Sequence, residues 1–211
     1  MLVEGRLWMT AKETARDRLM RKLVQVFLEH GFEHLTMRGI SKAADISPRS
    51  LYNYVSSKEE ALCESIRWMH GGEIRAGLAA GRRVLDEGGG AVDVLVAIFD
   101  TRYGMTRRNL GVSAHAADLN AQAFRRCYAV MTESAATFQD DVSTVLDDLS
   151  LRRLLILQPG VTSAELSQLL ADGARGVNQT LPARPESTLP ERYRRMIEAL
   201  LFGSAERAGP S

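Results

Sequence analysis

The chain has 211 residues, of which 45% are hydrophobic and 25% are charged. This length suits one compact domain or a small module attached to a larger one, and the composition excludes a chain that is disordered throughout. The net charge is only +1, but the residues through Lys58 carry ten Lys or Arg against six Asp or Glu. A basic N-terminal part on a mildly acidic remainder is compatible with one end of the molecule facing phosphate.

The two cysteines, Cys63 and Cys127, lie far apart and show no CxxC spacing. This pattern argues against a zinc ribbon, a CxxC redox site and the disulfide framework of a secreted protein. Residues 1–12 hold no apolar stretch of signal-peptide length, and no later run approaches a membrane span. We therefore expect a soluble, cytoplasmic protein whose core needs neither disulfides nor a structural metal.

Apolar residues recur with a helical period along the whole chain. The clearest stripe combines Phe138, Val142, Val145, Leu146 and Leu149. No segment shows the sustained alternation and hairpin signals that indicate strands. Breaks are expected where glycines and prolines cluster, at residues 88–90, 159–160 and 182–190. The predicted fold class is all-α.

Residues 16–61 predict a compact group of short helices. The first helix carries Leu19 to His30 and ends at Gly31, a residue suited to the left-handed conformation that closes helices. Thr36 is a suitable N-cap for a second helix over residues 37–44. Asp45 follows in a tight turn, where aspartate tolerates unusual backbone angles.

A third helix is predicted from Pro48 to about Val55, with Ser47 as its N-cap. Leu51 and Val55 would face inward, and Ser56 or Ser57 would cap a fourth helix that begins at Lys58. The outward side of the third helix would carry polar and aromatic side chains: Arg49, Ser50, Tyr52, Asn53 and Tyr54. Two short helices joined by a tight turn, the second bearing such residues, describe a helix-turn-helix.

These segments resemble the N-terminal domain of the tetracycline-repressor (TetR) family of transcription regulators. The matching positions share one register over about a quarter of the chain: residues 27–32, 35–36, 40–41, 43–47, 51–54 and 57–59. Three positions depart from the family pattern, which favours glycine at Asp45, phenylalanine at Val55 and alanine at Leu23. None of these three is among the residues expected to face DNA.

The resemblance implies an Ω-shaped homodimer that binds a palindromic operator in double-stranded DNA, with repression as the expected outcome. Residues 1–57 would form the helix-turn-helix DNA-binding head and residues 58–211 the helical body for effector binding and dimerisation. The last two long helices, around residues 165–177 and 190–203, would form the dimer interface. Their apolar stripes fit that role, and the predicted interface residues are Leu166, Leu169, Leu170, Tyr193, Ile197, Leu200 and Leu201.

The chemistry of the side chains divides the predicted DNA contacts into two kinds. Tyr52, Tyr54 and Lys58 suit phosphate, because a hydroxyl or a positive charge binds the backbone without reading sequence. Thr36 adds a further contact to the DNA backbone, and Ser47, the N-cap of the third helix, is also predicted to bind DNA. Base edges would be read by the remaining outward residues, Arg49, Ser50 and Asn53, since arginine pairs with guanine and asparagine with adenine.

Members of the family generally enclose a small-molecule pocket in the body, so we expect a small, largely apolar organic effector and no cofactor. The candidate lining residues are the aromatic and methionine side chains of the central helices: Trp68, Met69, Phe99, Tyr103, Phe124, Tyr128 and Met131. Ordinary core packing is the alternative for each of them. The fourth helix, from Lys58 towards Asp86, is the predicted lever between effector and head.

Two other classes of function stay open from the residues alone. A helical enzyme would use His115, Asp118 and Cys127, but no P-loop, GxGxxG, HExxH or GxSxG pattern accompanies them. The pairs His115/Asp118 and His70/Glu73 supply too few ligands for a metal. A ligand-independent module that binds another protein is the third possibility. We expect a regulator that is not an enzyme.

Overall fold

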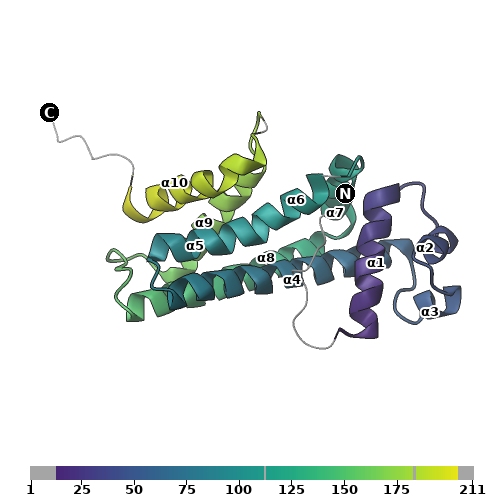
Figure 1. Ribbon diagram of the computed structural model, residues 1–211, viewed down its shortest axis with the longest axis horizontal. Helices are drawn as coiled ribbons and strands as arrows, with labels where there is room; N and C mark the ends of the chain where they lie inside the picture. The colour runs from purple at the N-terminus through teal and green to yellow at the C-terminus, as the bar shows by residue number, and fades with distance from the viewer. Residues whose placement is uncertain (1–12, 112, 183, 204–211) are drawn as a thin grey trace. The chain divides into compact units, whose positions relative to one another are not determined.

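The computed structural model describes residues 13–111, 113–182 and 184–203, and in these ranges the chain is helical and contains no strand (Figure 1). The predicted all-α fold class is confirmed. In chain order the helices are α1 (Ala15–His30), α2 (Met37–Ala43), α3 (Pro48–Tyr52), α4 (Lys58–Asp86), α5 (Ala91–Phe99), the π-helical η1 (Asp100–Gly104), α6 (Met105–Gly111), α7 (Ala116–Arg126), α8 (Tyr128–Leu151), α9 (Ser163–Asn178), the 3-10 helix η2 (Glu186–Thr188) and α10 (Leu189–Phe202).

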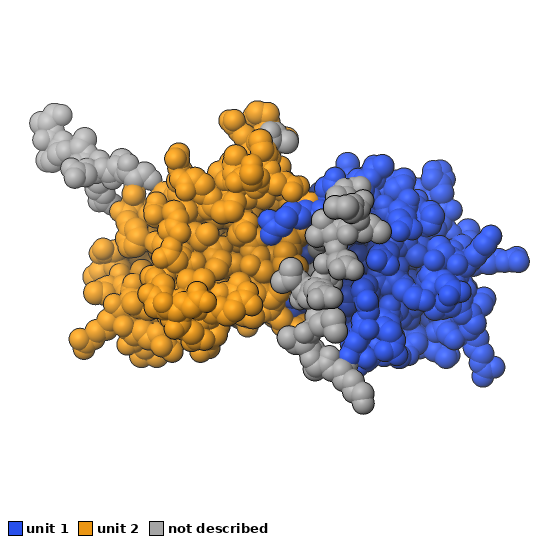
Figure 2. Space-filling view, viewed as in Figure 1, with its two compact units in different colours: residues 1–74, 108–136 blue, residues 75–107, 137–211 orange. Residues whose placement is uncertain are grey.

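The chain folds into two compact units (Figure 2). Of the described residues, the first unit takes those within 1–74 and 108–136, and the second takes those within 75–107 and 137–211. The predicted head therefore shares its unit with the first part of α4, with α7 and with the start of α8. The boundary predicted after residue 57 does not coincide with a boundary between the compact units, and the division of roles that it describes stays a prediction.

The helix ends in the first unit follow the predicted caps. The Thr36 hydroxyl accepts from the backbone N–H of Gly39 at 3.1 Å, and Ser47 caps α3 ahead of Pro48. Gly31 and Asp45 have positive φ angles of 70° and 50°, which glycine adopts readily and which aspartate tolerates in a tight turn. Caps of this kind satisfy amide groups that have no partner inside the helix.

Helix α3 is shorter than predicted, because regular helix ends at Tyr52 and not near Val55. The chain then closes into a tighter turn, in which the N–H groups of Tyr54 and Val55 both donate to the carbonyl of Leu51. The turn still carries Val55 back into the core, where it is 1% exposed. The predicted inward position of Val55 is therefore confirmed although the helix ends earlier.

One apolar core holds the first unit together. Its buried members come from α1, the loop between α1 and α2, α2, α3, the start of α4 and the α7–α8 segment, and include Leu23, Phe32, Ile40, Leu51, Leu62, Leu119 and Val130. A helix as short as α3 has no stability of its own in water. Its position therefore depends on the burial of Leu51 and Val55 against neighbouring helices.

The second unit has a separate core. Phe99, Tyr103 and Phe138 form a ring cluster in which Phe99 and Phe138 meet edge to face at 5.6 Å between centroids. Gly81 of α4 lies so close to Ile98 of α5 that a Cβ added to it would stand 2.5 Å from the isoleucine side chain. The glycine thus permits the close approach of the two helices. No helix of the described ranges combines the length and the apolar character of a membrane span.

Candidate nucleic-acid interface

Lys22 of α1 is hydrogen bonded to the turn that joins α2 to α3. The Lys22 ammonium donates to the carbonyl oxygens of Ala44 and Asp45, at 2.8 and 3.3 Å. The Ser41 hydroxyl of α2 donates across the turn to the carbonyl of Ile46 at 2.6 Å. These bonds fix the angle between the two short helices, which is the geometric requirement of a helix-turn-helix. Lys22 therefore has a structural role in this conformation.

The residues predicted to point outward from α3 and the turn after it are exposed: Arg49, Ser50, Tyr52, Asn53 and Tyr54. Tyr52 and Tyr54 keep 55% and 41% of their surface in solvent, a large fraction for aromatic residues of a packed unit. The group contains a guanidinium, an amide and three hydroxyls and no carboxylate. Such a set suits base edges and phosphate oxygens.

The two serines of this surface interact with each other. The Ser47 hydroxyl accepts from the backbone N–H of Ser50 at 3.0 Å, and the two hydroxyl oxygens lie 2.8 Å apart. Ser47 thus caps the helix and holds the Ser50 side chain. Thr36 is also exposed and caps α2, so its hydroxyl serves the helix in this conformation.

Lys58 has structural partners in addition to its predicted phosphate role. Its ammonium donates to the carbonyl oxygens of Phe32 and Glu33, at 3.1 and 3.3 Å, and lies 4.2 Å from the centre of the Phe32 ring. An ammonium has three protons, and these two bonds use two of them. One proton stays available for a phosphate oxygen, so the predicted contact is compatible with the observed bonds.

The segment between α3 and α4 is short and hydrogen bonded. The Ser57 hydroxyl accepts from the backbone N–H of Glu60 at 3.0 Å and so caps α4. The Glu60 carboxylate in turn accepts from the hydroxyl and the backbone N–H of Ser56, at 2.5 and 2.6 Å, and these bonds lower the pKa of Glu60. The recognition surface is therefore closely tied to the start of α4.

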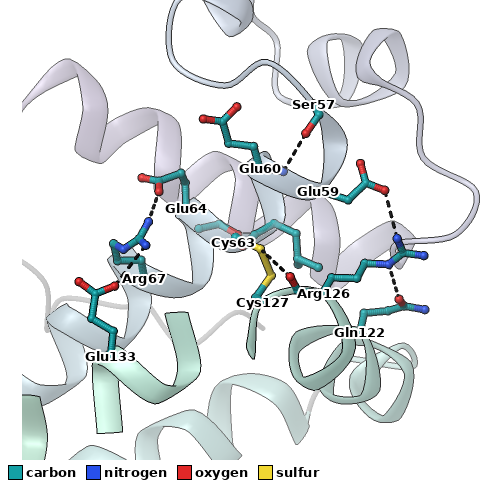
Figure 3. The surroundings of a disulfide bond; sticks show 12 residues. Ser57, Glu59, Glu60, Cys63, Glu64, Arg67, Gln122, Arg126, Cys127 and Glu133 are labelled. Carbon is teal, nitrogen blue, oxygen red and sulfur yellow. Dashed lines mark hydrogen bonds and ion pairs between the residues drawn. A yellow bond between two sulfur atoms is a disulfide. The ribbon is translucent and has the colours of Figure 1, made fainter. Parts of the chain in front are cut away.

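Helix α7 and the loop before it contact the head within the first unit. The Ser113 hydroxyl donates to the carbonyl of Leu28 at 2.6 Å, and the Gln122 amide donates to the Glu33 carboxylate at 2.6 Å. The Arg126 guanidinium binds the Glu59 carboxylate at 3.1 Å, on the first turn of α4 (Figure 3). These contacts connect a segment distant in sequence to both ends of the helix-turn-helix.

A disulfide joins Cys63 of α4 to Cys127 at the α7–α8 junction (Figure 3). Sequence reasoning missed this pair, because 64 residues separate the two cysteines and no short motif marks them. No disulfide was expected from the sequence, and the structure corrects this with one bond. Only the contact between α4 and α7, which a single sequence does not reveal, could have shown it.

The structure places the seven predicted effector residues in different surroundings. Trp68, Met69, Phe124, Tyr128 and Met131 belong to the first unit, and Phe99 and Tyr103 belong to the second. The Trp68 indole donates to the Asp17 carboxylate at 2.8 Å and packs against the core of the first unit. Phe124 and Tyr128 are 43% and 68% exposed. Their role in effector binding stays a prediction.

Phe99 and Tyr103 pack in the ring cluster of the second unit. Phe99 is fully buried, and burial raises the pKa of Tyr103. A surface depression of about 330 Å³ also occurs in the second unit, beside η2. None of the predicted effector residues lines it, since its walls are Thr180, Leu181, Arg184, Thr188 and Arg192.

The predicted dimer residues fall into two groups. Leu166, Leu170, Tyr193 and Ile197 are at most 5% exposed and form part of the core of the second unit. Leu169 and Leu200 are 56% and 38% exposed, and Leu201 is intermediate. Only the exposed group can contact a second subunit directly. Within the described ranges, no three His, Cys, Asp or Glu side chains come close enough to hold a metal ion.

The sequence of the chain is similar to those of known transcriptional regulators. Residues 19–62 match the family model described as bacterial regulatory proteins of the tetR family. The transcriptional regulator UidR of Escherichia coli K12 is 26% identical over 200 residues, which cover 92% of this chain and 97% of UidR. The regulator TcmR of Streptomyces glaucescens is 40% identical over 45 residues, but that match spans only 20% of TcmR.

Solved structures resemble the chain over most of its length. GusR of Salmonella enterica is 25% identical, with a TM-score of 0.65, over 88% of this chain and 94% of GusR. The tetR-family repressor FadR of Thermus thermophilus, solved with lauroyl-CoA, is 22% identical with a TM-score of 0.61, over 93% of this chain and 98% of FadR. The FadR likeness shows the fold alone.

Proposed function

Because the chain belongs to the tetR family and is a DNA-binding transcriptional regulator, we propose that it is a repressor that binds a palindromic operator as a homodimer and is released by a small-molecule effector. The observation that carries the proposal is the exposed polar and aromatic face of α3, held on a braced turn. The family consists of regulators and not of enzymes, so no catalytic role is proposed for His115, Asp118 and Cys127.

In the proposed complex, α3 enters the major groove. Arg49 and Asn53 read base edges, where each bidentate pairing is worth about 1–3 kcal/mol of discrimination. Ser50 adds a hydroxyl beside them. Phosphate contacts come from the flanking residues Thr36, Ser47, Tyr52, Tyr54 and Lys58, which position the helix and supply affinity for any sequence.

The proposal of a homodimer rests on apolar surface in the second unit. Leu169 of α9 and Leu200 and Phe202 of α10 are exposed, the last at 68%. A single short recognition helix reads few bases, whereas two helices related by a two-fold axis read a palindrome. We assign the interface to this exposed face of α9 and α10.

The proposed effector is a small organic molecule with a substantial apolar part. The FadR proteins of Thermus thermophilus and Bacillus subtilis were solved with lauroyl-CoA and stearoyl-CoA, which supports an organic ligand for this fold. Helix α4 contributes residues to both compact units, so a ligand that prefers one position of α4 would bias the head. We place the protein in the cytoplasm, because a chromosomal operator is there.

Selection of bound sequences from a random pool of double-stranded DNA tests the proposal. The expected result is a palindromic consensus whose half-sites lie about one helical turn apart, bound by a dimer on a sizing column. A protein that enriches no sequence and captures another protein instead would support the interaction module. Enrichment of single half-sites by a monomer would overturn the homodimer.

A further inference from the structure

The Cys63–Cys127 disulfide lies between the DNA-binding head and a segment distant in sequence. Cys63 stands in the second turn of α4, and Cys127 caps α7 immediately before α8 begins (Figure 3). Residues 53–57 alone separate α4 from the recognition helix. The bond therefore restrains the end of α4 that is nearest to the DNA-facing residues.

Other contacts besides the disulfide hold the same two segments of the first unit together. Two ion pairs also join α4 to the α7–α8 segment. Glu59 pairs with Arg126 at 3.1 Å, and Arg67 pairs with Glu133 at 3.2 Å. The apolar core beneath them includes buried residues of α4, α7 and α8. Chains of this length bury enough apolar surface to fold without disulfides. The two cysteines thus remain neighbours when the bond is broken, and the bond is free to form and break in the folded protein.

We propose that Cys63 and Cys127 form a site of reversible oxidation by small disulfides, and that the oxidised protein has the lower affinity for the operator. This inference rests on the proposed repressor function. In a reducing compartment the dithiol is the resting state, and a repressor occupies its operator at rest. Oxidation is then the signal that releases it.

The chemistry follows from the accessibility of the two sulfurs. Cys63 is partly buried, whereas Cys127 is only 2% exposed, so a small disulfide reaches Cys63 first. The Cys63 thiolate attacks one sulfur of the small disulfide, forms a mixed disulfide and expels one small thiolate. In the disulfide-bonded structure the Arg126 carbonyl oxygen lies 3.7 Å from the Cys63 sulfur, and it would accept the thiol proton once the bond is broken.

The Cys127 thiolate then attacks the Cys63 sulfur and expels the second small thiolate. The two protein thiols are oxidised by two electrons, the small disulfide is reduced to two thiols, and the two protons pass from the protein thiols to the leaving thiolates. No other oxidant is needed. The reverse exchange with an excess of small thiol regenerates the dithiol.

The covalent bond affects the head through α4. Breaking it lets the α7–α8 junction and the start of α4 move apart to the distance of unbonded sulfurs. Two residues at the start of α4 bind the chain on either side of the helix-turn-helix. The Lys58 ammonium donates to the carbonyl of Phe32, and the Glu60 carboxylate accepts from the hydroxyl and the backbone N–H of Ser56. A shift of α4 therefore changes the position from which α3 is presented to DNA.

The test equilibrates the folded full-length protein in buffers of varied reduced to oxidised glutathione ratio. Free thiols are counted by alkylation and intact mass, and affinity for the selected operator is measured by fluorescence anisotropy at each ratio. We expect a reversible two-thiol transition and a 5- to 150-fold weaker affinity of the oxidised form, the usual range of coupling between two sites. Circular dichroism verifies that the protein stays folded throughout.

Two matched variants separate the steps. Cys63→Ala should stay unmodified, and Cys127→Ala should stop at a glutathione adduct on Cys63; the unmodified form of each should bind the operator as the reduced protein does. Equal or tighter binding by the oxidised protein overturns the inference, as does a bond that is reduced only on unfolding. If the reduced protein and both variants bind no DNA, the repressor proposal fails and this coupling fails with it.

Discussion

At the scale of single residues, the exposed side of α3 carries the residues proposed to read DNA, whereas its buried side packs in the core. Arg49 and Asn53 are exposed, while Leu51 between them is fully buried. Arg49→Ala or Asn53→Ala should relax base preference at particular operator positions by about 1–3 kcal/mol and leave affinity for random DNA nearly intact. Competition titrations with single-base operator variants measure this. A uniform loss over all sequences would reassign the residue to phosphate contact.

Lys58 should show two effects, because its ammonium has both a structural and a predicted electrostatic role. Lys58→Ala is expected to weaken binding to all DNA sequences about equally and to lower the salt slope of log affinity by about one unit. It should also lower the melting temperature, since two hydrogen bonds to the loop at residues 32–33 are lost.

Lys22→Ala is the matched control for Lys58. It also removes an ammonium that binds two backbone carbonyls, those of Ala44 and Asp45, but Lys22 is not among the predicted DNA contacts. Its salt slope should therefore equal that of the wild type although its melting temperature falls. An unchanged slope for Lys58→Ala would show that Lys58 is not a phosphate contact.

How far single residues could be predicted depended on how local their partners are. Caps at Thr36 and Ser47, the left-handed Asp45 and the outward face of α3 all follow from short-range rules, and the structure bears them out. The disulfide, and the Trp68 bond to Asp17, require a packing partner tens of residues away. A single sequence carries no local signal for such contacts.

At the scale of helices, the close approach of α4 and α5 makes a specific prediction about Gly81. Alanine is the better helix former by about 1 kcal/mol, but a Cβ at this position would stand 2.5 Å from Ile98. Gly81→Ala should therefore destabilise the protein by about 1–3 kcal/mol through overpacking. Denaturant unfolding followed by circular dichroism gives the value.

Ala79→Gly provides the propensity reference on the same helix, because Ala79 is exposed. It should cost about 0.5–1 kcal/mol. If Gly81→Ala instead stabilises the protein by that amount, α4 and α5 have room to separate and the close approach is not required.

The helix pattern was also predictable only in part. The 3.6-residue period gave the all-α class and the buried stripe of α8, with Phe138, Val142, Leu146 and Leu149 at most 1% exposed. The π-helical η1 and the early end of α3 depend on hydrogen bonding that periodicity does not encode. The apolar stripes of α9 and α10 did not distinguish core residues from exposed ones, because periodicity does not show which side of a stripe another helix covers.

At the scale of the whole molecule, the proposed dimer depends on contacts made by the exposed leucines Leu169 and Leu200. Leu169→Glu or Leu200→Glu should give monomers, because each places a charge in a desolvated interface at a cost of several kcal/mol. Operator affinity should then fall by about 10²-fold or more, since the gain from two linked half-sites is lost. Sizing chromatography with light scattering and operator titration measure both.

Leu151→Glu is the control for the dimer test, because Leu151 is 83% exposed and lies outside α9 and α10. It should stay dimeric and bind the operator normally. A wild type that is monomeric at micromolar concentration would contradict the proposal, and so would dimers that persist in both interface variants.

The short recognition helix has a consequence for how the protein can evolve. Its position is set by Leu51, Val55 and the Ser47 cap, whereas Arg49 and Asn53 contribute nothing to the core. Exchanging this pair, which is proposed to read the bases, should therefore leave the fold intact, so that a duplicated gene could acquire a new operator by two substitutions and still give a stable protein. Changes in the DNA sequence that the protein binds are therefore independent of changes in its folded core. New regulatory circuits can arise from this chain at little cost in folding stability.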